Sequence, residues 1–582
     1  MADRREVLAG SLALAGAAAF GGAAVAAARA RPGTAAWPSQ ADWTGLGKAV
    51  GGRLAPGALP DLTDPAVRKL LSDPFYIGDQ PGLTQSSGWL DAWRSSPSAY
   101  VVTATGAADV AAAVDFARAH NLRLVIRGGG HSYLGASNAP DSLMIWTRPM
   151  NAIVVHDGFT PQGSGAVPVP AVSVGAGSIW LHAYQAVTNG AGRYDQGGGC
   201  TTVGVAGLVQ GGGFGSFSKG FGTVAASLLE AEIVTADGAI RVVNAAQEPN
   251  LFWALKGGGG GTFGVITRLT LATHELPKTF GAVNLSIHAR SDEAYQRLMA
   301  RFVDFAASNL CTPHWGEQVR VGPDNRLVVS MVFQGLGQDE AHTLWQPLLD
   351  FAKAHPEDYE GAESFAAQAL PARLFWNADF LKKYAPSAIT PDPRPQATAT
   401  DFWWAGDGEQ VGVFWHAYSS AWMPASLLRA SEQGKLVEAW FAASRHWPVG
   451  FHFNKGLFGA ADDTLAAARD TATNPDALSA FALAIIADAQ GQAFTGQPNL
   501  ALAKDRAAKV QAAMAALRAA APDTGAYVNE CDYFQPDWQR AFWGPHYPRL
   551  ARIKRRYDPD GLFTVHHGVG SEGWSADGFA RS

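Results

Sequence analysis

Three glycine-rich segments in the first half of the chain constrain its fold more than any other feature. They read RGGGHSYLG at residues 127–135, GGGCTTVGVAG at 197–207 with GGGFG following at 211–215, and GGGGG at 257–261. Glycine has no Cβ, so such loops let backbone N–H groups approach an anionic ligand closely. The first segment carries His131 and the second carries Cys200, and both side chains are nucleophiles able to bond covalently to an electrophilic cofactor. The pattern predicts a cofactor site built from loops that are distant in sequence.

The sequences of these segments resemble those of the berberine-bridge-enzyme-like flavin oxidases of the vanillyl-alcohol-oxidase superfamily. The resemblance covers residues 95–275 and begins again at Ala526. The resemblance implies FAD held bicovalently, through His131 at the flavin 8α-methyl carbon and through Cys200 at flavin carbon 6. The alternatives are a structural histidine and a small buried cysteine. The other cofactor contacts that the resemblance implies are Arg127, Gly128, Gly129, Gly130, Ser132, Gly135, Val203, Gly204, Gly207, Gly212, Gly213, Ile266, Tyr527 and Asn529.

The chain departs from the family at the catalytic base. Many members carry Tyr-x-Asn-Tyr, whose second tyrosine deprotonates the substrate, whereas this chain has Tyr527-Val528-Asn529-Glu530. A buried carboxylate with a raised pKa can act as a base, so Glu530 is our first candidate and Tyr533 our reserve. The alternative for Glu530 is a salt bridge, for instance to an arginine.

The expected fold is α+β: a two-part PCMH-type FAD-binding domain with an inserted substrate domain, whose antiparallel sheet is covered by helices. Apolar spacing predicts a helix over 107–120, a buried strand over 122–126 and a hairpin formed by 229–235 and 240–243. The glycines lack the G-x-G-x-x-G spacing of a Rossmann unit, and no helix clearly follows the first two loops. The expected organisation is a lead-in at 31–94, the FAD domain at 95–277, the substrate domain at 278–520 and a return to the FAD domain at 521–582.

The substrate domain contains an aromatic cluster that could line a binding cleft. Because alternate residues of a strand face opposite sides, Trp415 is not expected to share a face with His416 and Tyr418. Two of the three cysteines, Cys311 and Cys531, could form a disulfide, although the odd count excludes complete pairing. Cys200 has no neighbouring Cys or His at ligand spacing, so no metal site is expected there.

The N-terminus is typical of a targeting segment. Arg4-Arg5 precedes an uncharged apolar run, and Ala28-Arg29-Ala30 fits a cleavage site, so residues 1–30 resemble a twin-arginine export signal. The alternative is an uncleaved membrane anchor. We expect a periplasmic or secreted protein that is free of the membrane after cleavage. The net charge of −6 gives no reason to expect nucleic-acid binding.

Together, these expectations indicate an exported FAD-dependent oxidase that acts on the hydroxyl of a carbohydrate or another polar metabolite. A base would take the hydroxyl proton, the flavin would accept the hydride, and dioxygen would reoxidise the flavin to give hydrogen peroxide. Two alternatives remain open. One is a flavin dehydrogenase that passes electrons to a quinone or protein acceptor, and the other is a flavin-binding protein without turnover.

Overall fold

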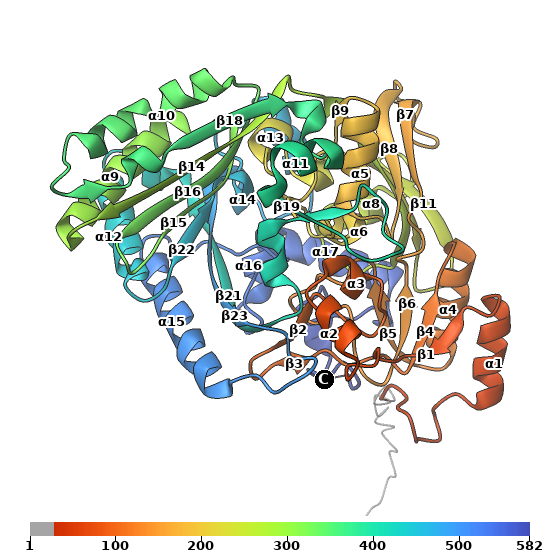
Figure 1. Cartoon of the computed structure of the whole chain (residues 1–582). Coiled ribbons are helices and arrows are strands. Elements are labelled where there is room, and N and C mark those ends of the chain that lie inside the picture. Colours follow the sequence, from red (N-terminus) through yellow and green to blue (C-terminus); the bar gives the residue numbers. More distant parts are fainter. Residues whose placement is uncertain (1–27, 582) are drawn as a thin grey trace, which may run out of the picture.

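The structure is a computed structural model that describes residues 28–581. Most of the segment expected to direct export therefore lies outside the described residues. Two groups of sheets stand side by side in Figure 1, one built mainly from the first half of the chain and one from the second half. Together they give the α+β architecture expected from the sequence.

A four-stranded sheet carries the first glycine-rich loop. Its order is β1-β4-β6-β5, and β4, β5 and β6 run parallel. Helix α4 buries Val110, Val114 and Ala117, the stripe that its sequence spacing predicts. Strand β5 ends at Arg127, where the glycine-rich loop begins, so the helix and strand expected at 107–126 are confirmed. The elements are β1 (Leu54–Pro56), β4 (Tyr100–Thr103), α4 (Ala107–Ala119), β5 (Arg123–Arg127) and β6 (Ser142–Trp146).

A five-stranded antiparallel sheet has the order β11-β10-β12-β8-β7, and the third glycine-rich segment leads into its strand β12. Its strands are β7 (Ile153–Phe159), β8 (Val169–Gly175), β10 (Leu228–Val234), β11 (Ile240–Asn244) and β12 (Val265–Ala272). Strands β10 and β11 form the predicted hairpin. The expectation that no helix follows the loops was wrong for the second one, because α6 (Val205–Gln210) begins directly after Gly204. This helix has only six residues, and its glycine hides the helical pattern.

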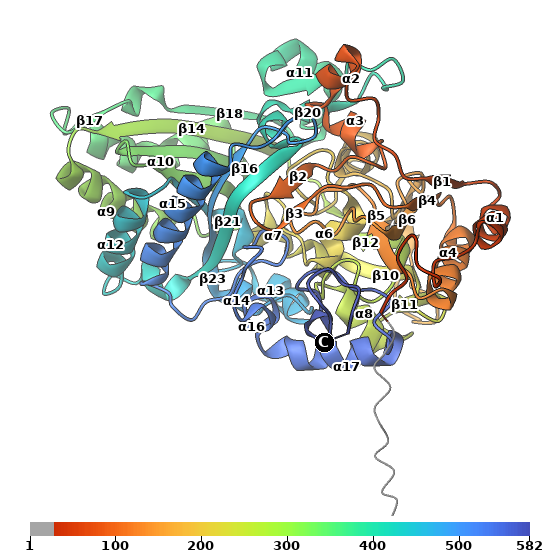
Figure 2. The ribbon, with the colours of Figure 1, turned by 90° about the horizontal axis from the view of Figure 1, so that it is seen from below.

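A ten-stranded sheet forms the second half of the molecule. Helices α9, α10, α12 and α15 pack against it and share one hydrophobic core with it (Figures 1 and 2). Its main strands are β14 (Thr279–Ala289), β15 (Trp315–Val321), β16 (Arg326–Gln334), β17 (Tyr359–Glu360), β18 (Ala366–Pro371), β21 (Val413–Pro424), β22 (Val449–His452) and β23 (Ala480–Gln490). The helices are α9 (Asp292–Asn309), α10 (Gln338–Lys353), α12 (Gln433–Ser444) and α15 (Leu500–Arg518).

Residues 31–94 are built into both halves, although their sequence suggests an irregular lead-in. Strand β1 pairs with β4, while β2 (Ser86–Trp89) runs parallel to β21 and pairs with β3 (Trp93–Arg94). Helix α1 (Gln40–Ala49) precedes β1, and the short helices α2 (Pro65–Leu70) and α3 (Pro74–Gly78) lie between β1 and β2. The large sheet is therefore completed from the N-terminal side of the chain.

The C-terminal segment returns to the first half, as expected. Helix α17 (Tyr547–Tyr557) lies near α8 (Pro249–Leu255) in Figure 2, and α16 (Trp538–Trp543) contacts α17. The Trp543 indole donates to the carbonyl of Gly257 at 2.9 Å, and buried Lys554 donates to the carbonyl of Thr262 at 2.6 Å. These bonds fix the third glycine-rich segment.

Short elements complete the described chain: α5 (Trp180–Tyr184), β9 (Arg193–Tyr194), α7 (Ser218–Phe221), β13 (His274–Glu275), α11 (Ala378–Tyr384), β19 (Ile389–Pro391), β20 (Phe402–Trp404), α13 (Asp462–Arg469) and α14 (Asp476–Ser479). Among the helices of residues 28–581, none is long and apolar enough to cross a membrane.

The two residues before the expected cleavage point belong to the folded body. Arg29 is 4% exposed, its backbone N–H donates to the Phe579 carbonyl at 2.8 Å, and its guanidinium lies 4.0 Å from the centre of the Trp574 ring. Ala30 forms a β-bridge with Leu122. Cleavage after Ala30 would therefore remove a buried arginine that holds the C-terminal tail.

Candidate active site

A cavity of about 730 Å³ is lined by residues from both halves of the molecule. Of the eighteen catalytic and cofactor-binding candidates that the sequence predicts, thirteen line it: Gly128, Gly129, Gly130, His131, Ser132, Cys200, Val203, Gly204, Gly207, Ile266, Tyr527, Asn529 and Glu530. Five do not line it: Arg127, Gly135, Gly212, Gly213 and Tyr533. Arg127 instead lies behind the loop, fully buried, and donates to the carbonyls of Gln80 at 2.7 Å and Ile77 at 3.0 Å.

The first two glycine-rich loops meet directly at the cavity. A Cβ added to Gly129 would lie 2.6 Å from the backbone nitrogen of Gly204, and a Cβ on Gly204 would lie 2.8 Å from that of Gly129. Such contacts are too short for any side chain, so both positions need glycine. This close approach brings His131 and Cys200, which lie far apart in the sequence, to one cavity.

The His131 imidazole is half-buried and uncharged. Its Nε2 lies 3.2 Å from the Thr202 hydroxyl, on the loop that carries Cys200. Burial, with a smaller contribution from the positive charge of Arg148, lowers the pKa of His131 to about 3. A neutral ring nitrogen has the free electron pair that covalent attachment needs.

Cys200 is a free thiol, as are Cys311 and Cys531, so the disulfide left open by the sequence does not form. Burial, followed by the charge of Asp407, raises the pKa of the Cys200 thiol well above its ordinary value. The thiol is therefore protonated at neutral pH.

The C-terminal segment supplies one polar wall. Asn529 donates to the Tyr527 hydroxyl at 3.0 Å. Both carboxylate oxygens of Glu530 are paired with the Lys455 ammonium, at 2.6 and 2.5 Å. The salt bridge considered for Glu530 is present, with lysine in place of arginine. Tyr533 lies behind this wall, its ring stacked 3.7 Å from that of His566, which lines the cavity.

The aromatic side chains of β21 are arranged differently from the sequence expectation. The ring of Trp415 lies 5.1 Å from that of Tyr418, and both contact Tyr133, at 4.8 and 5.0 Å. The register against β23 shifts between Trp415 and Ala417, so His416 is an extra residue on β21. A bulge of this kind breaks the two-residue alternation. The expectation that Trp415 and Tyr418 face opposite sides was therefore wrong.

Glu317 of β15 is a cavity residue that the sequence did not reveal. Its backbone has φ of 66°, an uncommon conformation for a residue that is not glycine. The carboxylate accepts hydrogen bonds from the Ser216 hydroxyl and, at 3.5 Å, from the Asn454 amide. Burial raises its pKa. No local motif marks Glu317, Asp407 or Lys455, because each reaches the cavity through the tertiary fold.

The cavity fits a ligand that is both polar and ring-containing. Buried polar atoms that have no hydrogen-bond partner within residues 28–581 include Gln210 Oε1, His452 Nδ1 and Asn454 Oδ1, and all three residues line the cavity. A Cβ on Gly207 or Gly260 would meet nothing within 4 Å. Unpartnered polar atoms beside open space at glycines fit the polar groups and broad ring of a flavin dinucleotide.

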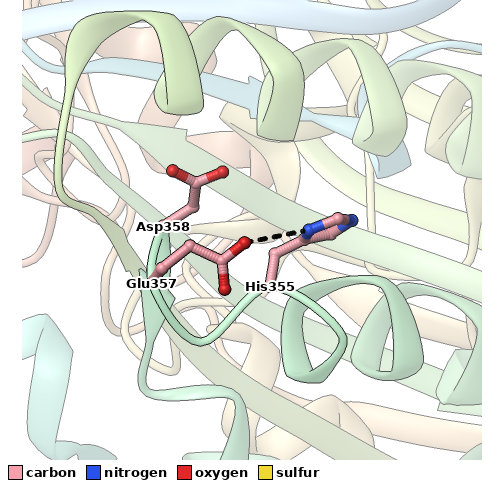
Figure 3. Close-up of side chains that lie close together, drawn as sticks. All are labelled: His355, Glu357 and Asp358. Carbon is pink, nitrogen blue, oxygen red and sulfur yellow. Dashed lines mark hydrogen bonds and ion pairs between the residues drawn. The ribbon is translucent and has the colours of Figure 1, made fainter.

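One grouping of potential metal ligands lies elsewhere on the part of the chain that the structure describes. His355, Glu357 and Asp358 follow α10, with ligand atoms within 4.8 Å of one another (Figure 3). His355 and Glu357 are exposed, and none of the three lines the cavity. Exposed acidic groups of this kind are common without an ion, so the cluster indicates no metal site.

Comparison with known proteins gives matches over most of the chain. The model of a family described as FAD binding domain matches residues 97–244, and that of a family described as berberine and berberine like matches residues 526–570. An FAD-linked oxidoreductase easE from Arthroderma otae is 33% identical over 490 residues, covering 83% of this chain and 74% of the relative. An uncharacterized FAD-linked oxidoreductase from Arthroderma benhamiae is 30% identical over 548 residues, covering 89% and 88%.

Two solved structures have similar folds. The VAO-type flavoprotein MtVAO615 from Myceliophthora thermophila C1 matches with a TM-score of 0.79 and 27% identity, over 96% of this chain and all of the other. Glucooligosaccharide oxidase from Acremonium strictum, whose structure is described as having a 6-S-cysteinyl, 8α-N1-histidyl FAD, matches with a TM-score of 0.63 and 18% identity, over 90% and 99%. The second likeness shows the fold alone.

Proposed function

We propose, from the premise that this chain belongs to the berberine-bridge-enzyme-like FAD-linked oxidoreductases of the vanillyl-alcohol-oxidase type, that it oxidises an alcohol with bicovalently bound FAD. The chain is an FAD-dependent oxidoreductase. The observation that carries the finer proposal is the position of His131 and Cys200, on two loops joined at Gly129 and Gly204 and facing one cavity. When bound, FAD supplies the acceptor for the two electrons removed from the carbinol carbon.

His131 and Cys200 would hold the flavin ring from two sides. The neutral imidazole needs no deprotonation before it bonds, whereas the Cys200 thiol must lose a proton. Two links fix the ring and leave the remaining cavity wall free to bind substrate. Gln318, Asn454 and Trp404 belong to that wall and come from the second half of the chain.

The proton acceptor that we propose is Glu530. Its carboxylate lines the cavity, and the Lys455 ammonium is paired with both of its oxygens. An ionised Glu530 oxygen can take the proton of a substrate hydroxyl placed beside it. Lys455 would then stabilise the charge on the substrate oxygen as that proton leaves.

The proposed substrate is a hydroxyl of a carbohydrate or another polar metabolite, with dioxygen as electron acceptor and hydrogen peroxide as product. The wall combines aromatic rings, such as Tyr418 and Trp404, with charged and amide groups, which suits a ring bearing several hydroxyls. Similar folds include oxidases named for chitooligosaccharide and glucooligosaccharide. Export through the twin-arginine signal is part of this proposal.

Two measurements test the function. Purified protein is incubated with a panel of sugars, amino sugars and simple alcohols, and peroxide release is followed beside reduction of a quinone-like dye. Peroxide formation with at least one hydroxylated substrate supports the oxidase. Dye reduction without peroxide would identify a dehydrogenase. Failure of every panel member to reduce the bound flavin would contradict alcohol oxidation.

A further inference from the structure

A short segment of the substrate half reaches across the cavity to the Cys200 loop. This 3-10 turn, Ala405–Gln410, follows β20 and places Asp407 beside Cys200. Oxygen Oδ2 of Asp407 accepts a hydrogen bond from the backbone N–H of Thr201 at 3.3 Å. The Asp407 and Cys200 side chains lie close enough for the charge of Asp407 to be the second-largest cause, after burial, of the raised pKa of the Cys200 thiol. A carboxylate is thus anchored at the nucleophilic sulfur by the neighbouring residue.

The chemistry of a partly buried thiol explains why the nearby carboxylate matters. The thiolate, and not the thiol, is the nucleophile of cysteine. Burial, and then the charge of Asp407, raise the pKa of Cys200, while the opposing effect of Lys455 is smaller and that of Glu317 adds to the rise. Deprotonation of Cys200 before the reaction is therefore strongly disfavoured. The sulfur can react only if its proton leaves to a base in contact with it.

Asp407 has the properties of such a base. Burial raises the pKa of Asp407 to about 6, so at pH 7 most molecules carry an ionised carboxylate that is more basic than an exposed aspartate. The hydrogen bond from the Thr201 N–H to Oδ2 holds this carboxylate against the loop that carries Cys200 and does not involve its other oxygen. The remaining charged groups of this neighbourhood, Lys455 and Glu317, lie close enough to affect the thiol pKa but are engaged with Glu530 and Ser216.

We propose that Asp407 is the general base for cofactor attachment, taking the Cys200 proton as the carbon–sulfur bond forms. This inference rests on the bicovalent linkage of the proposed function. In the overall step the S–H bond and one flavin C–H bond break and a C–S bond forms. The two protons and two electrons released convert one dioxygen molecule to hydrogen peroxide. Asp407 holds the thiol proton before it passes to solvent.

The test isolates the sulfur link. In a His131→Ala background only Cys200 can attach FAD, and we compare that parent with three additional changes: Asp407→Asn, Asp407→Glu and Glu409→Gln. Asparagine keeps an acceptor for the Thr201 N–H but removes the base. Glu409 is an exposed acid of the same turn that does not line the cavity, so its change controls for lost charge.

Samples taken at intervals after induction are analysed for total bound FAD and, after denaturation, for covalently attached FAD by intact mass. We expect equal total FAD in all four proteins, and attachment slowed roughly 10²-fold or more by Asp407→Asn. Asp407→Glu should recover much of the rate, and Glu409→Gln should match the parent. Attachment in the parent should also slow as the pH falls below about 6, where Asp407 becomes protonated.

Attachment in the Asp407→Asn protein at the parental rate, with the same total FAD, would overturn the role of Asp407. If the Asp407→Asn protein binds no FAD, the role of Asp407 is tested by the attachment rate of the Asp407→Glu protein and by the pH dependence of attachment in the parent. An attachment rate that does not change with pH contradicts the proposal. Absence of covalent FAD in the His131→Ala parent itself, beside attachment in Cys200→Ala, would instead refute the bicovalent linkage.

Discussion

The Nζ atom of Lys455 lies 2.6 and 2.5 Å from the two carboxylate oxygens of Glu530, inside the cavity that holds His131 and Cys200. The side chains are only 12% and 19% exposed. Removing either partner would leave a largely buried charge without its counterion, which is destabilising. The pair therefore couples the proposed base to the stability of the site.

Glu530→Gln should slow flavin reduction by roughly 10²–10⁴-fold, because the amide cannot accept the substrate proton. It should also lower stability by roughly 1–3 kcal/mol, since Lys455 loses its counterion. Stopped-flow reduction and thermal unfolding measure the two effects. Adding Lys455→Met should restore stability but not the rate. Tyr533→Phe, outside the cavity, should reduce at close to the wild-type rate. Near-wild-type reduction by the glutamine variant would assign the base elsewhere.

Covalent attachment can be measured without turnover. The wild-type protein should keep its yellow colour after acid precipitation, because two covalent links survive unfolding. His131→Ala and Cys200→Ala should each retain flavin through the other residue, and only the double variant should release it. Free FAD in the supernatant of the precipitated wild-type protein would disprove both links.

Asp195 should make stability depend on pH. Its carboxylate is fully buried, both oxygens lack a hydrogen-bond partner among the described residues, and burial raises its pKa to about 7. The folded state therefore holds a proton that the unfolded chain releases near pH 4, so stability falls between about pH 4 and pH 7. Asp195→Asn should raise the unfolding temperature at pH 8, by the equivalent of up to about 4 kcal/mol, and change it little at pH 4. An equal effect of the substitution at both pH values would contradict this account.

The N-terminus of the exported protein should lie at or before Arg29, and not at Arg31 as the cleavage motif suggests. Arg29 is buried against Trp574 and donates to the Gly561 carbonyl and, at 3.2 Å, to the Thr564 hydroxyl. N-terminal sequencing of exported protein tests this, and a mature chain starting at Arg31 would refute it. Replacing Arg4-Arg5 by Lys-Lys should block export and leave flavin loading unchanged.

The first half of the fold and the cofactor loops could be predicted because their signals are local. The stripe of Val110, Val114 and Ala117 marks a helix by itself, and the glycines around His131 and Cys200 identify the loops. The partners of those loops could not be predicted in this way. Lys455 meets Glu530 across 75 positions, and Asp407 meets the Thr201 N–H across 206. Contacts between residues so distant in the sequence produce no periodic pattern from which they could be predicted.

The side of the sheet on which Tyr418 lies could not be predicted, because one extra residue in β21 moves its side chain to the opposite side. Alternation along β21 places Trp415 and Tyr418 on opposite sides, but the bulge at His416 brings both to Tyr133. The position of Glu317 at the cavity could not be predicted either, because its left-handed φ arises only in the folded backbone.

The parallel pairing of β2 with β21 has a consequence for making chimeras within this family. A substrate domain cut at residues 278 and 520 would carry β21 without the neighbour supplied by residues 86–89, and would leave an apolar strand edge open to aggregation. Exchanging substrate preference between relatives therefore requires transplanting residues 86–94 together with the large domain, as two pieces of one unit.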